Sequence, residues 1–134
     1  MGVTNYGYRE AAKKWAQAQT TFQAFASYYT AQAASEFKRV AAKNSPVETG
    51  HLRRSWEVGP VERDAKTMRA SVYNTTNYAI HVEYGHRIIR NGRYVGYVPG
   101  QYFFQRSLSQ FRPMFRQIAK DCQRDINKAL GGGR

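Results

Sequence analysis

The strongest constraint on the fold is a stretch of chain, from Tyr8 to Lys43, that contains neither proline nor glycine. It is rich in alanine, glutamine, lysine and glutamate, which are good helix formers. Large apolar residues recur along it at steps of three and four, with small alanines between; they are Trp15, Ala18, Phe22, Phe25, Tyr29, Ala33, Phe37 and Val40. This spacing predicts one long amphipathic helix. It ends before Pro46, because the residue preceding a proline avoids the helical region.

The length of this helix bears on assembly. At ~1.5 Å per residue it would run to about 50 Å, whereas a compact globule of this many residues is only about 35–40 Å across. The helix should therefore overhang its own domain or break, and the step pattern changes after Tyr29 in a way that is typical of a bend or a change of partner. An overhanging apolar stripe needs a neighbouring chain, so the pattern indicates oligomerisation.

The middle of the chain reads as a loop and a hairpin. Val47–Gly50 is a loop in which Thr49 is placed to cap a short helical turn over His51–Ser55. Trp56–Val61 looks extended, and Thr67–Asn74 alternates apolar with polar residues, as a strand with one buried face does. We predict that these two segments pair as an antiparallel hairpin.

A second hairpin and a second long helix complete the pattern. Tyr78–Tyr84 is compatible with either a short helix or a strand. Asn91-Gly92 lies between two β-prone runs and is a strong hairpin signal; the hairpin is basic, because it carries Arg87, Arg90 and Arg93. Gln101–Leu130 is again amphipathic, with Pro113 inside it as a point where the helix kinks or splits.

These elements predict one α+β domain over residues 1–134. It has a long N-terminal helix, a small antiparallel sheet with the basic β-hairpin, and a long C-terminal helix kinked near Pro113, with the helices packed on one face of the sheet. We expect residues 1–7 and 131–134 to be flexible.

Charge limits the classes of partner. The 21 lysines and arginines outnumber nine acidic residues and give a net charge of +12, which favours an anionic partner such as nucleic acid or an acidic protein surface. The single cysteine, Cys122, excludes an internal disulfide and falls on the apolar face of the last helix. No apolar run approaches the ~20 residues that span a bilayer, and the N-terminus lacks the apolar core of a signal peptide. We therefore expect no membrane partner.

No catalytic constellation is evident. His81-Val82-Glu83 resembles the start of a zinc deaminase motif, but the cysteine pair that would complete the site is missing. Acidic residues are too sparse for a two-metal nuclease, and there is no glycine-rich phosphate loop. The sequence predicts a protein that is not an enzyme and that uses no cofactor or metal.

Two segments resemble motifs of a known family. Ser45 to Trp56 is similar to a Pro-Val-acidic-Thr-Gly-x-Leu-Arg-x-Ser pattern, which it matches at Pro46, Thr49, Gly50, Leu52, Arg53 and Ser55. A second element matches at Tyr78, Val82, Glu83, Tyr84 and Gly85. Over about Tyr8 to Leu130 the chain resembles the tail-completion proteins of long-tailed phages, akin to minor tail protein Z. It departs from that pattern at His86, where the family usually has threonine, and in the arginine-bearing hairpin.

The resemblance implies a structural virion protein of the tail or neck, made in the host cytoplasm. It implies a ring of this subunit, for which we expect six copies. The ring joins the tail terminator or tube protein to the head connector or stopper protein and lets genomic DNA pass. A tail terminator, a head-completion protein or a small basic DNA-binding protein are the alternatives. The motif residues either form the assembly interface or fix a corner of the fold, with Glu83 expected to pair with Arg53 or Arg54. The hairpin arginines are expected to contact DNA or an acidic partner.

Overall fold

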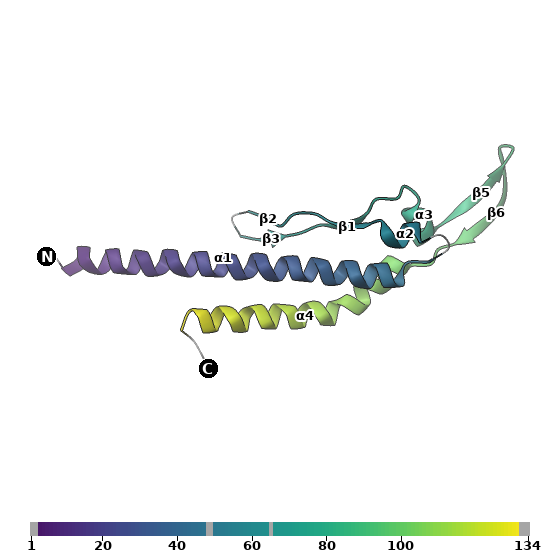
Figure 1. Cartoon of the computed structure of the whole chain (residues 1–134). Coiled ribbons are helices and arrows are strands. Elements are labelled where there is room, and N and C mark those ends of the chain that lie inside the picture. The colour runs from purple at the N-terminus through teal and green to yellow at the C-terminus, as the bar shows by residue number, and fades with distance from the viewer. Residues whose placement is uncertain (1–2, 48–49, 65, 132–134) are drawn as a thin grey trace.

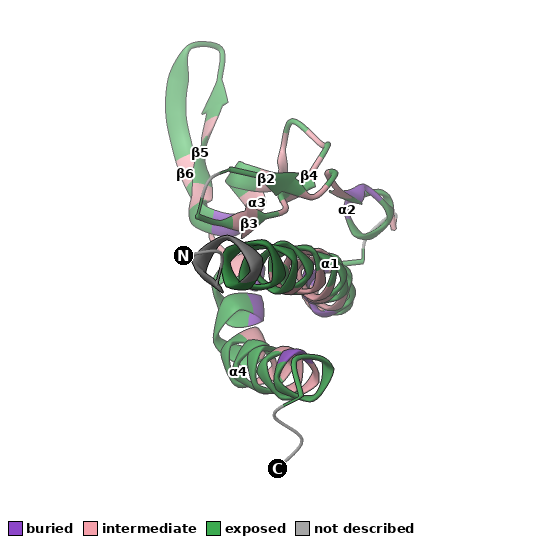
Figure 2. Ribbon diagram, turned by 90° about the vertical axis from the view of Figure 1, so that its left-hand side faces the viewer, coloured by how far each residue is buried: buried purple, intermediate pink, exposed green. Residues whose placement is uncertain are grey.

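The protein is an elongated stack of three layers. In the computed structural model, which describes residues 3–47, 50–64 and 66–131, helix α1 (Val3–Asn44) lies between a narrow β-ribbon and helix α4 (Phe103–Ala129) (Figure 1). The end-on view shows the same order, with the ribbon on one side of α1 and α4 on the other (Figure 2). The α+β prediction is confirmed. Both helices lie on one side of the ribbon as expected. Most of the ribbon is covered by α1; α4 meets it through Phe103 and Phe104, which lie against Trp56, and then runs along the far side of α1.

Helix α1 overhangs the rest of the subunit. It is unbroken from Val3 to Asn44 and extends beyond both the ribbon and the end of α4 (Figure 1). Phe37, near its C-terminal end, is buried, whereas Trp15 is 69% exposed. The predicted overhang is confirmed. Helix α1 includes residues 3–7 of the N-terminal arm that we expect to be flexible.

The β-ribbon is the predicted first hairpin. Strands β1 (Trp56–Val58) and β4 (Val72–Asn74) pair antiparallel, and farther along β2 (Glu62–Arg63) pairs with β3 (Met68–Arg69). The predicted alternation holds, since Met68, Ala70 and Val72 are half-buried while the residues between them are exposed. The half-buried face lies over α1, so the ribbon and α1 cover one another.

The second hairpin projects from the end of the subunit that lies opposite the N-terminal overhang of α1 (Figure 1). Strands β5 (Gly85–Arg90) and β6 (Arg93–Pro99) pair around Asn91 and Gly92, whose φ angles of 52° and 75° are those of the expected two-residue turn. The ambiguous segment before it is a helix, α3 (Ala79–Tyr84), and not a strand. Between α1 and the first hairpin, a single helical turn, α2 (His51–Arg54), takes the place predicted for it.

Helix α4 contains Pro113 but is not split by it. Figure 1 shows that α4 changes direction in its first part and then runs beside α1. Its N-terminal end helps to close the core, in which Phe37 and Ala41 of α1 meet Leu52, Trp56 and Phe103. Each large apolar side chain that is fully buried contributes roughly 1.5–3 kcal/mol. Among the described helices, none has a segment long and apolar enough to cross a membrane.

Candidate assembly site

The two motif segments meet at one corner of the fold, where α1 ends and α4 begins. Leu52 and Trp56 from the first segment are buried in the core, and Tyr78 and Val82 from the second pack against it. Phe104 of α4 stacks on Trp56, with 6.1 Å between ring centroids and 12° between their planes. The corner therefore joins the end of α1, both motifs and the start of α4 in one apolar cluster.

A buried serine links α1 to the tryptophan of the first motif. Ser45 Oγ donates to the Ala41 carbonyl at 2.7 Å and accepts from Trp56 Nε1 at 2.8 Å. Both side chains are almost fully buried, at 2% and 3% exposure. Because a buried indole N–H needs an acceptor, this serine determines how the indole is seated.

Arg53 and Ser55 stabilise the backbone around the first motif. The Arg53 guanidinium donates to the Lys43 carbonyl at 3.2 Å and to the Ser45 carbonyl at 3.3 Å, which places a positive charge at the negative end of the α1 dipole. Ser55 Oγ donates to the His51 carbonyl at 2.6 Å. Gly50 has a φ of 75°, a left-handed conformation that favours glycine. Thr49, which we expected to cap α2, lies outside the described residues.

Glu83 caps α4 rather than forming the expected ion pair. It is 4% exposed, and its carboxylate accepts from the backbone N–H of Phe104 at 2.8 Å and of Gln105 at 3.1 Å. The predicted pairing with Arg53 or Arg54 is therefore wrong, since Arg53 is engaged by the end of α1. The first N–H groups of a helix have no partner inside it, and a carboxylate beside them also interacts favourably with the helix dipole.

Gly85 and Gly100 allow two backbones to cross beside this cap. Gly85 ends α3 with a φ of 85°. A Cβ on Gly100 would lie 2.6 Å from the Tyr84 carbonyl carbon and 2.9 Å from Gly85 N. The crossing is held by the Gln101 N–H, which donates to the Val82 carbonyl at 2.8 Å, and by the Tyr97 hydroxyl, which donates to the Tyr84 carbonyl at 2.8 Å.

A model of a known protein family matches the part of the chain that contains both motif segments of this corner. Residues 9–85 match the family model described as "Bacteriophage HK97-gp10, putative tail-component". The chain belongs to this phage tail-component family. No curated protein and no solved structure matches the chain. The match confirms the family resemblance, and membership in a tail-component family implies a structural protein of the virion.

The matched segment of this tail component ends where β5 begins, so the second hairpin and α4 lie outside it. Both motifs lie within the match and line one hollow of about 570 Å³ at the surface of the corner. Pro46, Gly50 and Leu52 come from the first motif, and Tyr78 and Val82 from the second. The motif residues thus combine two roles: buried groups fix the corner, and their neighbours shape a surface beside it.

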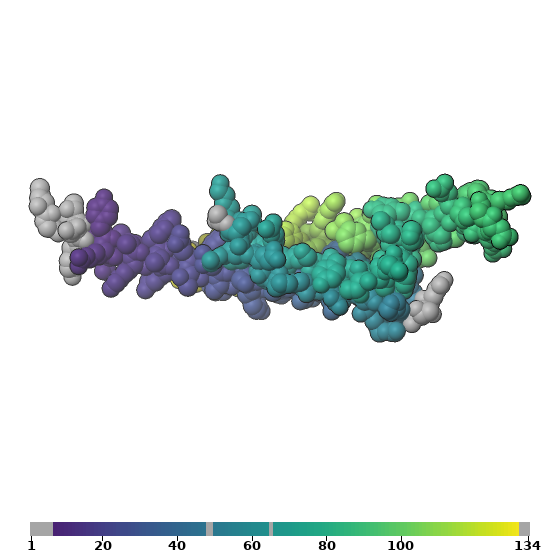
Figure 3. Space-filling view, turned by 90° about the horizontal axis from the view of Figure 1, so that it is seen from above, coloured from purple at the N-terminus to yellow at the C-terminus, as the bar shows by residue number. Residues whose placement is uncertain are grey.

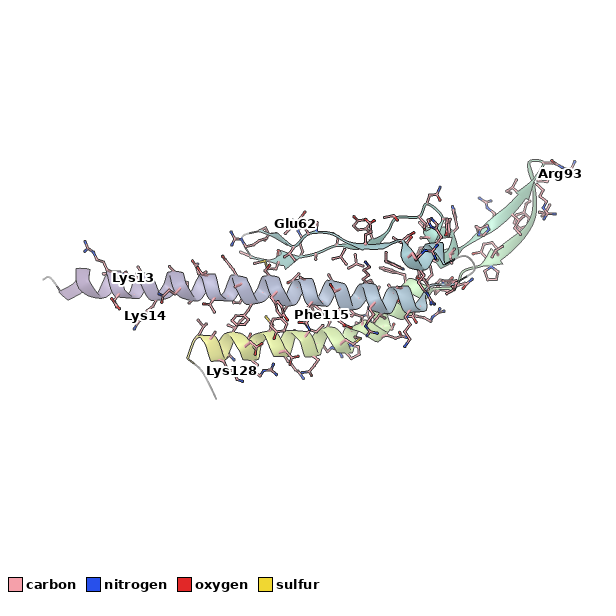
Figure 4. All side chains as sticks on the ribbon, in the orientation of Figure 1. Lys13, Lys14, Glu62, Arg93, Phe115 and Lys128 are labelled. Carbon is pink, nitrogen blue, oxygen red and sulfur yellow. The ribbon has the colours of Figure 1, made fainter. Side chains whose placement is uncertain are left out.

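The hairpin arginines of the tail component do not form one cluster. Arg90 is paired with Arg93 beside the turn, and Arg87 is paired with Tyr97 nearer the base of the hairpin. Arg87 and Arg90 are three positions apart in β5, which is an odd number. Successive side chains of a strand point to opposite faces, so Arg87 lies on the other face of the hairpin. Figure 4 shows Arg93 at the tip. All three arginines are exposed.

A second polar contact joins the two long helices of the tail component. The Tyr29 hydroxyl of α1 donates to the Asp125 carboxylate of α4. This hydrogen bond raises the pKa of Tyr29 to about 12 and holds the pKa of Asp125 below its ordinary value. Burial raises the pKa of the nearby Cys122 thiol, which agrees with a packing role for that side chain. Within the described residues, histidine, cysteine and acidic side chains form no group of three that could hold a metal.

Sequence reasoning missed three residues of this corner. Gly100, Phe103 and Asn74 lie outside the two motif segments and were not named as site residues, yet Gly100 makes the backbone crossing possible and Phe103 is 2% exposed. Asn74 Nδ2 donates to the Leu52 carbonyl at 2.8 Å. The available signal was the Pro99-Gly100 pair directly before an aromatic run, which marks a tight turn into a helix.

Proposed function

We propose that the protein is a tail-completion or neck subunit of a phage. Copies of it form a ring, expected to hold six, between the tail terminator or tube protein and the head connector or stopper protein, and genomic DNA passes through the ring. The observation that carries this proposal is the family match over residues 9–85. A tail component acts by assembly, so its surfaces for other chains are the functional features.

The overhang of α1 supports contact with a second copy. Tyr8 is 74% exposed, Trp15 69% and Phe22 53%, and they recur every seven residues, which keeps them on nearly one face. The same face carries Tyr29, which contacts α4. Trp15 and Phe22 also line a hollow of about 420 Å³, together with Leu130, directly after α4, and with Arg63 and Met68 of the ribbon. The overhanging stripe continues the α1–α4 interface into open solvent, where another copy would cover it.

The hairpin is the second uncovered surface. Tyr94, Tyr97 and Ile89 are each more than half exposed, and tyrosine and arginine are enriched at protein interfaces. The overhang and the hairpin lie at opposite ends of the subunit (Figure 3). If the overhang of one copy contacts the hairpin end of the next, the interface is heterologous. Such an interface builds a ring when the rotation from each subunit to the next closes on itself. The corner hollow lies at the base of the hairpin, so we propose Pro46, Tyr78 and Val82 as residues of the same interface.

Cryo-electron microscopy of virions from the source phage tests the proposal. We expect a ring of this subunit between the head connector and the tail tube. A ring at the end of the tube alone would make it a tail terminator, and a ring on the connector alone a head-completion protein. Absence from the virion would overturn the proposal.

A small basic DNA-binding protein is the second candidate, favoured by the net charge of +12. Sedimentation velocity of the purified protein separates the two. A monomer or dimer with steeply salt-dependent DNA affinity favours the second candidate, whereas a ring without DNA favours the first.

A further inference from the structure

We propose that the outer face of α4 is the surface that contacts the phosphate backbone of duplex DNA. This inference deepens the proposed function and rests on it for the place of contact, the lumen of the ring. It replaces the hairpin arginines as the principal contacts.

Basic side chains follow one another along α4 at a fixed step. The series recurs every four residues and consists of Arg112, Arg116, Lys120, Arg124 and Lys128. A step of four residues rises ~6 Å along a helix and turns by about 40°, so the series spans about 24 Å and winds across the outer half of α4. All five side chains are exposed. DNA carries one phosphate per roughly 1.7 Å of its axis, so a row of this length can lie beside several phosphates.

The row lies on the side of α4 that faces away from the protein. The opposite side holds Ile118 and Ile126, which are half-buried and buried, and Asp125, which is bonded to Tyr29 of α1. Figure 4 shows Lys128 on the side of α4 away from α1. Because α4 is the outermost layer (Figure 2), neither α1 nor the ribbon covers this face.

The charges of the row are largely uncompensated. The two acidic residues of α4 are both engaged: Asp121 accepts from Arg124 at 3.1 Å, and Asp125 accepts from Tyr29 and Arg124. Within the described residues, Arg112, Arg116 and Lys120 make no ion pair. Like charges four residues apart repel and destabilise a helix, and a polyanion along the row removes that repulsion.

The neighbours of the row suit contact with a backbone rather than recognition of bases. Neutral polar residues lie among the charges: Gln123 and Asn127 fall within the row, and Ser109 comes just before it. Such side chains commonly donate to phosphate oxygens. Contacts to phosphates carry no sequence information. A surface of this kind holds any passing sequence, as a channel for a genome requires.

Two variants of equal net charge test the assignment. R112Q/R116Q/K120Q removes three charges from α4, and R87Q/R90Q/R93Q removes three from the hairpin; all six residues are exposed. Binding of the full chain to a labelled DNA duplex is measured by fluorescence anisotropy over a series of salt concentrations. We expect the α4 variant to lower the slope of log affinity against log salt by about 2.7, or about 0.9 per contact. The hairpin variant should leave the slope nearly unchanged.

Equal losses in the two variants would mean that only net charge matters, and a larger loss in the hairpin variant would return the contact to the hairpin. Either result overturns the assignment. Tighter binding of the native protein to polyglutamate than to a DNA duplex of equal charge would also overturn it, because it would indicate an acidic protein partner. Thermal melting checks that both variants remain folded. Ring formation is measured without DNA, so failure here is distinguishable from failure of the proposed neck role.

Discussion

The Glu83 carboxylate accepts a hydrogen bond from the backbone N–H of Phe104 at 2.8 Å, and so joins the second family motif to the first turn of α4. Phe104 lies outside the segment that matches the family model, whereas Glu83 lies within it. The motif glutamate therefore determines where α4 begins and, through α4, where the basic row lies relative to α1.

Replacing this carboxylate should destabilise the fold. Glu83→Ala leaves two part-buried helix N–H groups without their acceptor and should cost about 1–3 kcal/mol of unfolding free energy. Glu83→Gln keeps one acceptor but loses the charge, and should cost about 1 kcal/mol. Urea denaturation measures both. The matched control is Glu62→Gln, whose exposed side chain makes only a 3.7 Å ion pair and should change the free energy by under about 0.5 kcal/mol. Equal effects at Glu83 and Glu62 would contradict the cap.

Ser45→Ala tests the buried serine. The substitution leaves the Trp56 indole N–H without its 2.8 Å acceptor, and a buried donor without a partner costs about 1–3 kcal/mol. Ser35→Ala, at an exposed position of α1, is the control and should lie within about 0.5 kcal/mol of the native protein. Urea midpoints decide between them, and a stable Ser45→Ala protein would show that the indole finds another acceptor.

Gly100→Ala should prevent the backbone crossing at the corner. The added Cβ would lie 2.6 Å from the Tyr84 carbonyl carbon, so one of the two segments must shift, at a cost of about 2 kcal/mol or more. Gly96→Ala is the control, because its Cβ would meet only Ile88 Cδ1, at 3.7 Å. Differential scanning calorimetry should show a large fall in Tm for the first variant and little change for the second.

The elements of this fold were predictable because each has a local signal. The absence of proline and glycine predicts α1, Asn91-Gly92 predicts the second hairpin, and the position of Pro113 predicts a disturbance in α4. The hydrogen-bond partners of Glu83 at the corner had no such local signal. Counting charges suggested an arginine partner for Glu83, but its partners are backbone N–H groups 21 and 22 residues away. Their need for an acceptor exists only once α4 begins at that point. The alternation in the ribbon likewise predicted a buried face without indicating which helix covers it.

The Tyr29–Asp125 bond should make stability depend on pH at both extremes. The pKa of Tyr29 is raised from 10.0 to about 12, so its contribution is complete below pH 10 and is lost as the pH rises toward 12. The pKa of Asp125 is lowered, chiefly by the same bond. Its contribution is present above the ordinary aspartate pKa of about 3.9 and is lost as the pH falls below it. Tyr29→Phe should flatten both limbs of the urea midpoint against pH. If the acid and alkaline limbs of Tyr29→Phe are the same as those of the native protein, other titrating groups cause them.

Trp15→Gln should impair assembly without weakening the fold. Trp15 is 69% exposed on the overhang, so removing the indole costs the isolated subunit little, within about 0.5 kcal/mol. In a ring the same side chain would be covered by a second copy, and truncating a buried aromatic at an interface commonly costs 2 kcal/mol or more, at least about 30-fold in affinity. Sedimentation velocity over a concentration series should show the variant shifted to smaller species. Tyr73→Gln, an exposed aromatic on the ribbon, is the control and should assemble as the native protein does. If Trp15→Gln assembles as well as the native protein, the overhang is not part of the interface between subunits. The hairpin and the corner hollow must then contact a different surface of the neighbouring copy.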